Sequence, residues 1–361
     1  MNMKKVLFET HHLYYWPNFL PVVEELLKRE NYVINVSMPK RSSSFQENIL
    51  DNVCSVTGIS FITANTEEER INKIIKEDYD IIIVGNVGQL NQIASSDALV
   101  AMVYHGIGLK QSYYNDIDER IDIRSVESVA RFNELKDNGH NNLSLTGYTK
   151  LDRLVTLTNE SLDETRPKLE IDPSRKTVLY APSFYPTSID KIHPFLPELA
   201  QDHNLIIKLH GFSWEQKKYC YQNIICSALS KENENIHLLD NDDYDIIPYY
   251  LMADILISDI SSTMFEYLPI DKPIIQAQCY SLKLKHRIFK RRFWRKMDLE
   301  RQNSVDFAYQ ILEPEDLLGM VYYAIDNMEE MSLKRIEASK YYLYKTDGKA
   351  SSRLVDSIEN Y

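Results

Sequence analysis

Short apolar runs alternate with longer amphipathic stretches along most of the chain. In the first half, runs rich in valine, isoleucine and leucine occur at residues 6–8, 32–38, 80–84, 99–104 and 143–146. Runs of this kind predict strands of a parallel sheet that is buried on both faces. Residues 17–30 begin with a proline and place their aliphatic residues on one side at helical spacing, which predicts an amphipathic helix.

The alternation restarts after a polar stretch at 155–176 that contains two prolines. The later strands are predicted at 177–181, 205–209, 236–239, 254–258 and 273–276, and the helices at 246–252, 261–268, 315–328, 332–345 and 349–360. Two such halves predict an α/β protein with two Rossmann-like domains. We expect these domains at 1–155 and 177–345, with a linker at 156–176 and a final helix within 346–361.

Composition narrows the function classes. The length of 361 residues suits two domains, and 44% apolar and 26% charged residues are ordinary for a globular protein. A net charge of −12 argues against nucleic acid as a partner. The four cysteines form no CxxC pair, and no close cluster of histidines and cysteines has the spacing of a zinc site. The first residues predict a strand rather than a signal peptide, so we expect a cytoplasmic protein.

Polar residues follow several predicted strands directly. These residues are His105 and Gly106, Pro182 and Ser183, His210 and Gly211, and Asp259. Open α/β sheets bind ligands outside the carboxyl ends of their strands. Because the residues come from both halves of the chain, the sequence predicts an active site in a cleft between the domains.

The two histidines suit acid–base or phosphate chemistry. His105 precedes Gly106, which allows a sharp turn, and Lys110 brings a cation within reach. An imidazole titrates near neutrality, so His105 is a candidate general base. Alternation along the strand puts Lys208 and His210 on one side, which favours a phosphate or diphosphate ligand. The alternatives are a histidine that only ends its strand and a lysine that is merely solvated.

Ser258 to Glu266 reads as a strand end, a turn and a helix start. Ser261 or Ser262 is a suitable N-cap, Thr263 follows, and Glu266 lies within about one turn. A helix N-terminus with free N–H groups binds anions. A capping box alone needs no ligand, but its position at a strand end favours a phosphate site here.

Two further features follow from the pattern. His11 and His12 come after the first strand and are equally consistent with lining the cleft and with a structural role.

The stretch from Lys283 to Lys296 holds eight lysines and arginines with phenylalanine and tryptophan interleaved. In an acidic protein this favours contact with an anionic membrane surface or a polyanionic acceptor over an ordinary basic helix.

The strand-end residues lie in segments that resemble motifs of the CDP-glycerol glycerophosphotransferase family, whose members prime and polymerise teichoic acids and some capsule polymers. The family's Trp-His-Gly-x-Pro-Leu-Lys is similar to residues 104–110, and its Ser-Asp-x-Ser-Ser-x-x-Phe-Glu to 258–266. Four more motifs resemble 146–152, 179–183, 208–211 and 347–353, in the family's order. Tyr104, Gly108 and Gly211 depart from the pattern, and Phe184 to Pro186 stand where an arginine is common.

The resemblance implies a GT-B fold with the donor mainly on the second domain and the last helix packed toward the first. It implies attack of an acceptor hydroxyl on the β-phosphorus of a CDP-polyol, with CMP leaving. His105 is then the base and His210 binds the diphosphate. Asp259, Ser261 and Ser262 hold phosphate, and Glu266 reaches the ribose. No cofactor is required beyond the CDP-linked donor substrate.

Three functions compete at this point. The first is transfer of glycerol phosphate, or a related polyol phosphate, to a cell-surface glycan or lipid-linked acceptor at the inner face of the membrane. The second is a GT-B glycosyltransferase with a nucleotide-sugar donor in surface polysaccharide synthesis. The third is a non-catalytic scaffold, which the joint presence of both histidines and the serine turn disfavours.

Overall fold

The computed structural model describes residues 3–107, 118–157, 162, 169–289, 291 and 304–361. The chain divides into two compact units. Unit 1 comprises Met1–Gly106, Ser112–Val155 and Tyr341–Tyr361, and unit 2 comprises Ile107–Gln111 and Thr156–Lys340. The end of the chain therefore belongs to the same unit as its beginning.

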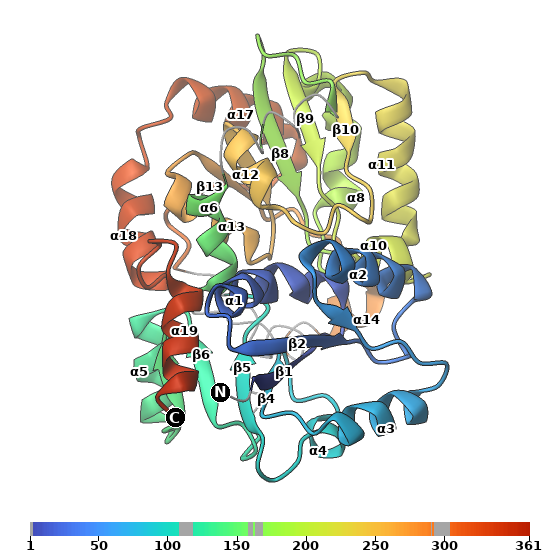
Figure 1. The fold of residues 1–361 in the computed structure, drawn as a ribbon. Helices are drawn as coiled ribbons and strands as arrows, with labels where there is room; N and C mark the ends of the chain where they lie inside the picture. Colours follow the sequence, from blue (N-terminus) through green and yellow to red (C-terminus); the bar gives the residue numbers. More distant parts are fainter. Residues whose placement is uncertain (1–2, 108–117, 158–161, 163–168, 290, 292–303) are drawn as a thin grey trace. The chain divides into compact units, whose positions relative to one another are not determined.

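Unit 1 is built on a parallel sheet in the order β3-β2-β1-β4-β5-β6-β7 among the described strands (Figure 1). The strands are β1 (Lys4–Glu9), β2 (Tyr32–Ser37), β3 (Ser60–Phe61), β4 (Ile81–Val84), β5 (Leu99–Val103), β6 (Ile123–Val126) and β7 (Leu143–Leu145). The order reverses between β1 and β4, as in a Rossmann-like sheet. Every residue of β4 is buried, as expected for a continuous apolar strand in mid-sheet.

Helices connect the strands of unit 1. They are η1 (Leu13–Tyr15), α1 (Trp16–Lys28), α2 (Ser44–Thr57), α3 (Glu67–Glu77), α4 (Leu90–Ile93), α5 (Val129–Asp137), η3 (Thr149–Asp152), α6 (Arg153–Thr156) and α19 (Ala350–Glu359). α1 has a proline in its first turn and buries an aromatic and aliphatic face, as its sequence pattern predicts. Side chains of Ser43, Thr66 and Ser128 cap α2, α3 and α5.

The last helix, α19, packs against α1 within unit 1 (Figure 1). Asp152 Oδ1 accepts a hydrogen bond from the backbone N–H of Ala350 at 2.9 Å, and its Oδ2 accepts one from Ser351 at 2.7 Å. Arg353 Nε donates to the Thr146 carbonyl at 2.6 Å. The sequence motifs at 146–152 and 347–353 thus meet, and their contacts hold the last helix on unit 1.

Unit 2 has a second parallel sheet, in the order β10-β9-β8-β11-β12-β13 among the described strands. The strands are β8 (Lys176–Ala181), β9 (His203–Ile207), β10 (Ile236–Leu238), β11 (Ile255–Ser258), β12 (Ile274–Ala277) and β13 (Tyr309–Ile311). The order reverses between β8 and β11, so unit 2 is also Rossmann-like. The hydrophobic core of unit 2 joins these strands to four helices, α8 (Ile189–Ile192), α9 (Leu196–Leu199), α11 (Cys220–Glu232) and α17 (Leu317–Asp326).

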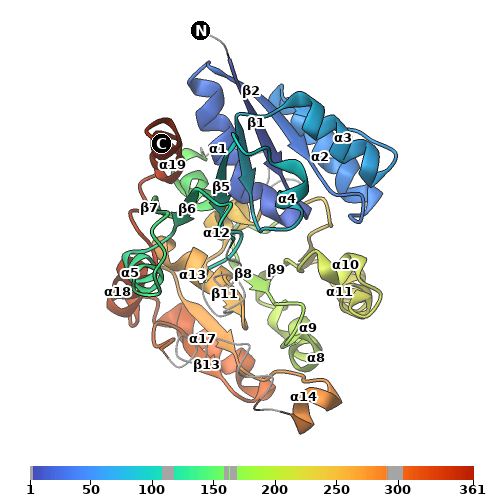
Figure 2. The same cartoon turned by 90° about the horizontal axis from the view of Figure 1, so that it is seen from below.

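The helices of unit 2 are α8 (Ile189–Ile192), η5 (His193–Phe195), α9 (Leu196–Leu199), α10 (Phe212–Glu215), α11 (Cys220–Glu232), α12 (Ile247–Met252), α13 (Thr263–Tyr267), η6 (Leu268–Ile270), α14 (Leu284–Ile288), η7 (Pro314–Asp316) and α17 (Leu317–Asp326). α18 (Ser332–Tyr342) continues into unit 1. α14 lies at the periphery of unit 2 (Figure 2). None of the helices among the described residues combines the length and the hydropathy that a membrane span needs.

Candidate functional site

In unit 2, the predicted site residues gather at the point where the strand order reverses. Pro182 and Ser183 follow β8, and Asp259 follows β11. The side chain of Asp259 is fully buried. Its carboxylate accepts hydrogen bonds from Ser183 N at 2.7 Å, Ser188 N at 3.0 Å and Ser188 Oγ at 3.0 Å. Asp259 therefore holds the loop after β8 in place, an environment different from the phosphate contact that the resemblance implies.

The serine turn begins α13 next to this loop. Ser258 Oγ donates to the Ala181 carbonyl at 2.7 Å and lies 2.8 Å from Thr263 Oγ1, so it joins β8, β11 and the helix. Ser261, Ser262 and Thr263 are partly exposed. Ser262 is the N-cap, but its side chain makes no capping hydrogen bond, whereas Ser261 Oγ, the other predicted cap, accepts one from the backbone N–H of Thr263 at 3.4 Å. The backbone of Ser262 is helical, with φ −64° and ψ −20°, whereas a capping side chain needs an extended residue.

Glu266 points into unit 2. Its side chain is 1% exposed, and Oε2 accepts a hydrogen bond from Tyr250 OH at 2.9 Å. This contact links α13 to α12. A contact from Glu266 to a ribose stays a prediction.

His210 follows β9 on the same side of the sheet as the loop after β8. Its Nδ1 accepts a hydrogen bond from Phe212 N at 3.1 Å, so the neutral ring carries its proton on Nε2. The ring packs 4.7 Å from Phe184 and 5.0 Å from Phe212. His210 is thus fixed by its neighbours and presents an N–H, which is a suitable donor to a phosphate oxygen.

Lys208 and Gly211 flank His210 in the structure. Lys208 is partly exposed, and its Nζ donates to the Leu209 carbonyl at 3.3 Å. Gly211 has φ −51°, a value that proline also adopts, although the family pattern has proline here and this chain has glycine. A Cβ on Gly211 would meet no atom closer than Asn241 Oδ1 at 4.0 Å. The departure from the pattern therefore needs no different backbone around His210.

In unit 1, His105 follows β5 beside the point where the strand order reverses. Its Nδ1 lies 2.9 Å from the Gly85 carbonyl oxygen. A carbonyl only accepts, so Nδ1 carries the proton and the neutral ring has its lone pair on Nε2. The ring stacks on Tyr15 with centroids 4.0 Å apart. Gly106, the next residue, is buried. This tautomer and this fixed ring are what a general base requires.

The residues that orient His105 were not singled out from the sequence. A Cβ on Gly85 would lie 2.5 Å from the Tyr15 ring, so glycine allows the ring to pack against β4. Asn86 Nδ2 donates to Tyr15 OH at 2.8 Å. The aromatic run Tyr14, Tyr15 and Trp16 after the first strand was the only local hint of these contacts. Tyr15 meets residues that follow β4 and β5, which are far from it in the sequence, so the local pattern could not predict the contact.

A buried ion pair supports the end of β1. Arg70 on α3 is fully buried and donates to both carboxylate oxygens of Glu9, at 3.0 and 2.9 Å. It also donates to Ser37 Oγ at 2.6 Å and Gln89 Oε1 at 3.0 Å. This network joins β1, β2 and the loop after β4, which are the segments around the carboxyl edge of the sheet.

His11 and His12 lie directly after β1. His11 is 1% exposed, and neither of its ring nitrogens has a hydrogen-bond partner in the described part of the chain. Burial, with a further contribution from the charge of Arg41, lowers the pKa of His11 to about 3. The same two causes lower the pKa of His12 to about 4. Both rings are therefore neutral near pH 7.

Some predictions remain open. Lys110 lies outside the described residues, as does most of the second half of the stretch from Lys283 to Lys296. His105 belongs to unit 1, and His210 and the serine turn belong to unit 2. A cleft shared by these edges stays a prediction. Among the described residues, no group of three or more His, Cys, Asp or Glu side chains is placed to hold a metal ion.

Two Rossmann-like units, each with polar residues at the carboxyl edge of its sheet, define a protein of the GT-B class. The family described as CDP-glycerol:poly(glycerophosphate) glycerophosphotransferase matches residues 126–360. The chain belongs to this family.

Relatives agree with this assignment. The chain is 24% identical over 238 residues to a teichoic acid poly(glycerol phosphate) polymerase of Staphylococcus epidermidis, covering 59% of this chain and 29% of the relative. It is 28% identical over 198 residues to the teichoic acid glycerol-phosphate primase of Bacillus subtilis, covering 52% and 44%. The matches thus span less than half of each relative.

A solved structure of the wall teichoic acid polymerase TagF has the same fold. It matches with a TM-score of 0.71 and 18% sequence identity, over 99% of this chain and 88% of that chain.

Proposed function

We propose that the protein transfers glycerol phosphate, or a related polyol phosphate, from a CDP-linked donor to a hydroxyl of a glycan or lipid-linked acceptor. Membership in the family supports the reaction class. The observation that carries the proposal is the geometry of His105: its Nδ1–H is held on the Gly85 carbonyl, 2.9 Å away, within the family's motif. This leaves Nε2 as the basic atom at the carboxyl edge of the sheet.

In the proposed reaction the acceptor oxygen attacks the β-phosphorus of the donor. The bond from that phosphorus to the new oxygen forms while the bond to the bridging oxygen breaks, and the bridging oxygen leaves with CMP. His105 Nε2 takes the proton of the acceptor hydroxyl. Positioned general bases of this kind typically contribute about 10²- to 10⁴-fold to a rate.

Unit 2 holds the donor in this proposal. His210 presents a fixed N–H, and the partly exposed hydroxyls of Ser261, Ser262 and Thr263 lie at the start of α13. Asp259 acts as a positioning residue, because its three hydrogen bonds hold Ser183 and Ser188 beside the serine turn. Fixed donors of this kind stabilise the charge that develops on a transferring phosphoryl group.

Activity with purified protein tests the proposal. We expect acceptor-dependent release of CMP from CDP-glycerol, and a loss of about 10²- to 10⁴-fold in His105→Ala, as for a lost general base. His210→Ala is expected to weaken CDP binding as well. His193→Ala is the matched control, since that histidine lies on η5 and its Nδ1 is bonded to the Ile189 carbonyl. Release of UDP from UDP-sugars, with CDP-glycerol inert, would instead establish a glycosyltransferase.

We further propose that unit 2 meets an anionic membrane surface through α14, at the start of the basic stretch. Leu284, Ile288 and Phe289 are 73%, 66% and 63% exposed, and Lys283 and Arg291 are exposed beside them. Exposed apolar side chains among cations are typical of a helix that lies in a membrane interface.

Vesicle sedimentation tests this surface. We expect binding to vesicles that contain phosphatidylglycerol, weakening as salt is raised. Leu284→Ser with Ile288→Ser should abolish it. Leu333→Ser is the control, because Leu333 is 77% exposed on α18. Binding that ignores salt, or that survives the double substitution, would contradict the proposal.

A further inference from the structure

The carboxyl edge of unit 1 has a second group of polar residues beside His105. His11 follows β1 and Asn86 follows β4, which are the two strands between which the sheet order reverses. Ligands of open α/β sheets bind at this kind of position. The proposed phosphate transfer uses neither residue.

The backbone at Gly88 packs against His11 and Asn86. A Cβ on Gly88 would lie 2.0 Å from His11 Nε2 and 2.9 Å from Asn86 Oδ1, so only glycine fits here. His11 is 1% exposed, whereas Gly88 is exposed. Gly88 has φ +48°, which glycine adopts without strain.

The polar atoms of His11 and Asn86 beside Gly88 lack hydrogen-bond partners among the described residues. Both ring nitrogens of His11 and the Oδ1 of Asn86 are buried without a hydrogen bond in the described part of the chain. Buried polar groups are nearly always paired, so an unpaired group calls for an explanation such as a ligand. The Nδ2 of Asn86 donates to Tyr15 OH at 2.8 Å, and Tyr15 stacks on His105. The unpaired atoms are therefore connected to the proposed base through a single side chain.

The chemistry of these atoms identifies the ligand class. A neutral imidazole has one donor and one acceptor, and an amide oxygen only accepts. The oxygens of a phosphate diester or of a phosphate monoester dianion only accept, so they cannot satisfy the acceptor nitrogen of His11. A hydroxyl both donates and accepts. Burial and the charge of Arg41, which keep the pKa of His11 at about 3, agree with a neutral ring.

We propose that His11 and Asn86 form a hydroxyl-binding subsite, which holds the polyol end of the acceptor beside His105. The proposal rests on the proposed function for the identity of the acceptor. The step is binding only: His11 accepts one hydroxyl hydrogen bond and donates another, and His105 remains the base. Because the Gly88 backbone leaves no room for one more carbon atom beside His11 Nε2, binding requires the turn at Gly88 to move.

Histidine side-chain NMR on the full chain tests the subsite without turnover. The His11 signals are assigned by their loss in His11→Asn. We expect sn-glycerol 3-phosphate to shift them saturably and sulfate, a tetrahedral dianion without a hydroxyl, to leave them in place. The proposal is overturned if glycerol 3-phosphate leaves the His11 signals unmoved, or if sulfate shifts them equally. Asn86→Leu is the second variant, and in it the response to glycerol 3-phosphate should be lost.

Kinetics add an independent readout. In His11→Asn the acceptor KM is expected to rise about tenfold, equivalent to about 1.4 kcal/mol, with a smaller change in kcat at saturating acceptor. His140→Asn is the matched control, a partly buried histidine that precedes β7 in unit 1. An unchanged acceptor KM overturns the subsite. If the wild-type protein releases no CMP at all, the proposed function fails, and the NMR experiment alone decides on the subsite.

Discussion

At the scale of single residues, unpaired polar side chains at the carboxyl edge of the unit 1 sheet should lower the free energy of unfolding. Leaving a buried polar group unpaired costs about 1–3 kcal/mol, and His11 has two such nitrogens. The Asn86 Oδ1 adds a third atom. Unfavourable environments of this kind concentrate where ligands bind. The same residues therefore have a consequence for folding that is measurable without any ligand.

The pH dependence of stability should reveal His11. Its pKa is about 3 in the folded protein and about 6.5 in an unfolded chain. As the pH falls below about 6.5, the unfolded chain takes up the proton first, so stability falls by up to about 1.4 kcal/mol per pH unit. Urea unfolding between pH 6.5 and 4.5 should show a shallower dependence of stability on pH in His11→Leu than in the wild type. An equal slope in the wild type and His11→Leu would contradict a buried neutral His11.

Replacing Gly211 with alanine is predicted to stabilise the protein. With φ −51° and no atom closer than 4.0 Å to the place of an added Cβ, the native backbone accepts alanine. Gly211→Ala should raise the free energy of unfolding by about 0.4–1 kcal/mol, because the unfolded chain loses freedom. A destabilisation in urea unfolding would mean that the backbone at His210 needs glycine.

The principal histidines were predictable from the sequence, and the residues that orient them were not. His105 and His210 need only an apolar run followed by a polar residue. The stacking of Tyr15 on His105 joins segments far apart in the chain, so local pattern carries no information about it. The hydrogen bonds of Asp259 have no local signal for the same reason, since its partners Ser183 and Ser188 lie in the segment after another strand.

At the scale of elements, α19 is held by a carboxylate from another part of the chain. Asp152 caps its first turn through Ala350 N and Ser351 N. Asp152→Ala should cost about 1–2 kcal/mol, as for other lost N-caps. Asp347→Ala is the matched control: its ion pair with Arg353 is 41% exposed on the aspartate side and should be worth about 1 kcal/mol or less. Equal costs in chemical denaturation would contradict the capping role.

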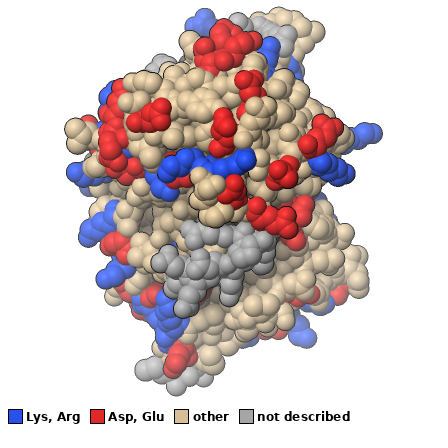
Figure 3. Space-filling view, turned by 90° about the horizontal axis from the view of Figure 1, so that it is seen from above, with Lys and Arg blue, Asp and Glu red and all other residues tan. Residues whose placement is uncertain are grey.

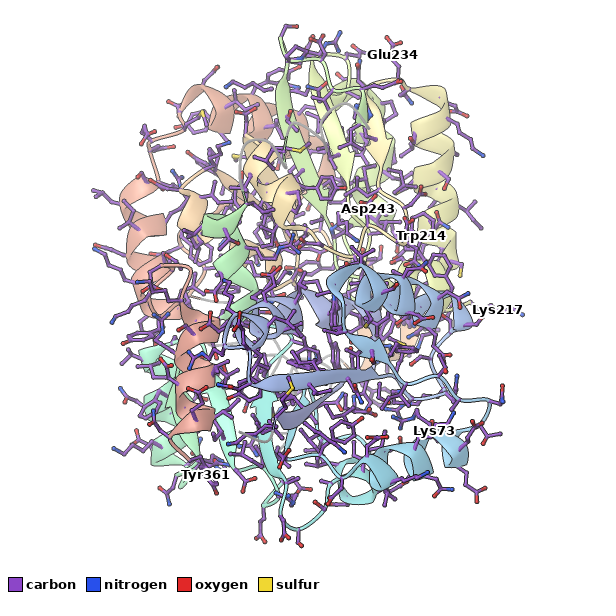
Figure 4. All side chains as sticks on the ribbon, in the orientation of Figure 1. Lys73, Trp214, Lys217, Glu234, Asp243 and Tyr361 are labelled. Atoms are coloured by element: carbon purple, nitrogen blue, oxygen red, sulfur yellow. The ribbon has the colours of Figure 1, made fainter. Side chains whose placement is uncertain are left out.

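The buried ion pair between Arg70 on α3 and Glu9 on β1 should contribute more to the free energy of unfolding than the cap of α19. Removing one partner of a buried pair typically costs about 3–5 kcal/mol, so Arg70→Met should destabilise unit 1 strongly. Lys73 on the same helix, labelled in Figure 4, has a side chain that is 48% exposed and pairs with Glu69. Lys73→Met should cost about 1 kcal/mol or less.

A double variant separates charge from packing. Arg70 also pairs with the partly exposed Glu67, at 2.6 Å. Adding Glu9→Gln to Arg70→Met removes the buried one of the two carboxylates left without their partner and should recover part of the loss. Similar costs for Arg70→Met and Lys73→Met would show that the buried pair contributes little.

Among the elements, the apolar strands were predicted well and the polar ones were not. β4, with four consecutive aliphatic residues, is found within one residue of its predicted start. β6 was missed because Arg124 and Ser125 interrupt its apolar run, although both are buried. Arg124 is accommodated by long-range contacts, including a hydrogen bond to Tyr104 OH at 3.3 Å. A buried arginine of this kind has no local signature.

At the scale of the whole molecule, charge does not identify the ligand. The net charge is −12, and Figure 3 shows Lys and Arg interspersed with Asp and Glu on the face that it draws. In the proposed transfer, the phosphates of the donor substrate would therefore be recognised by local N–H and O–H groups such as the N–H of His210. The proposed reaction is supported instead by three features taken together. They are the family of the chain, its two Rossmann-like units and the histidine that follows a strand in each unit.

The most direct test of the proposed transfer measures both products of one reaction. Purified protein is given CDP-glycerol and a glycerol phosphate acceptor, and CMP and the lengthened acceptor are quantified together. We predict one CMP for each glycerol phosphate unit added, with both products lost in His105→Ala and retained in His193→Ala. CMP release without any lengthened acceptor, or a lengthened acceptor formed equally well by His105→Ala, would contradict the proposal.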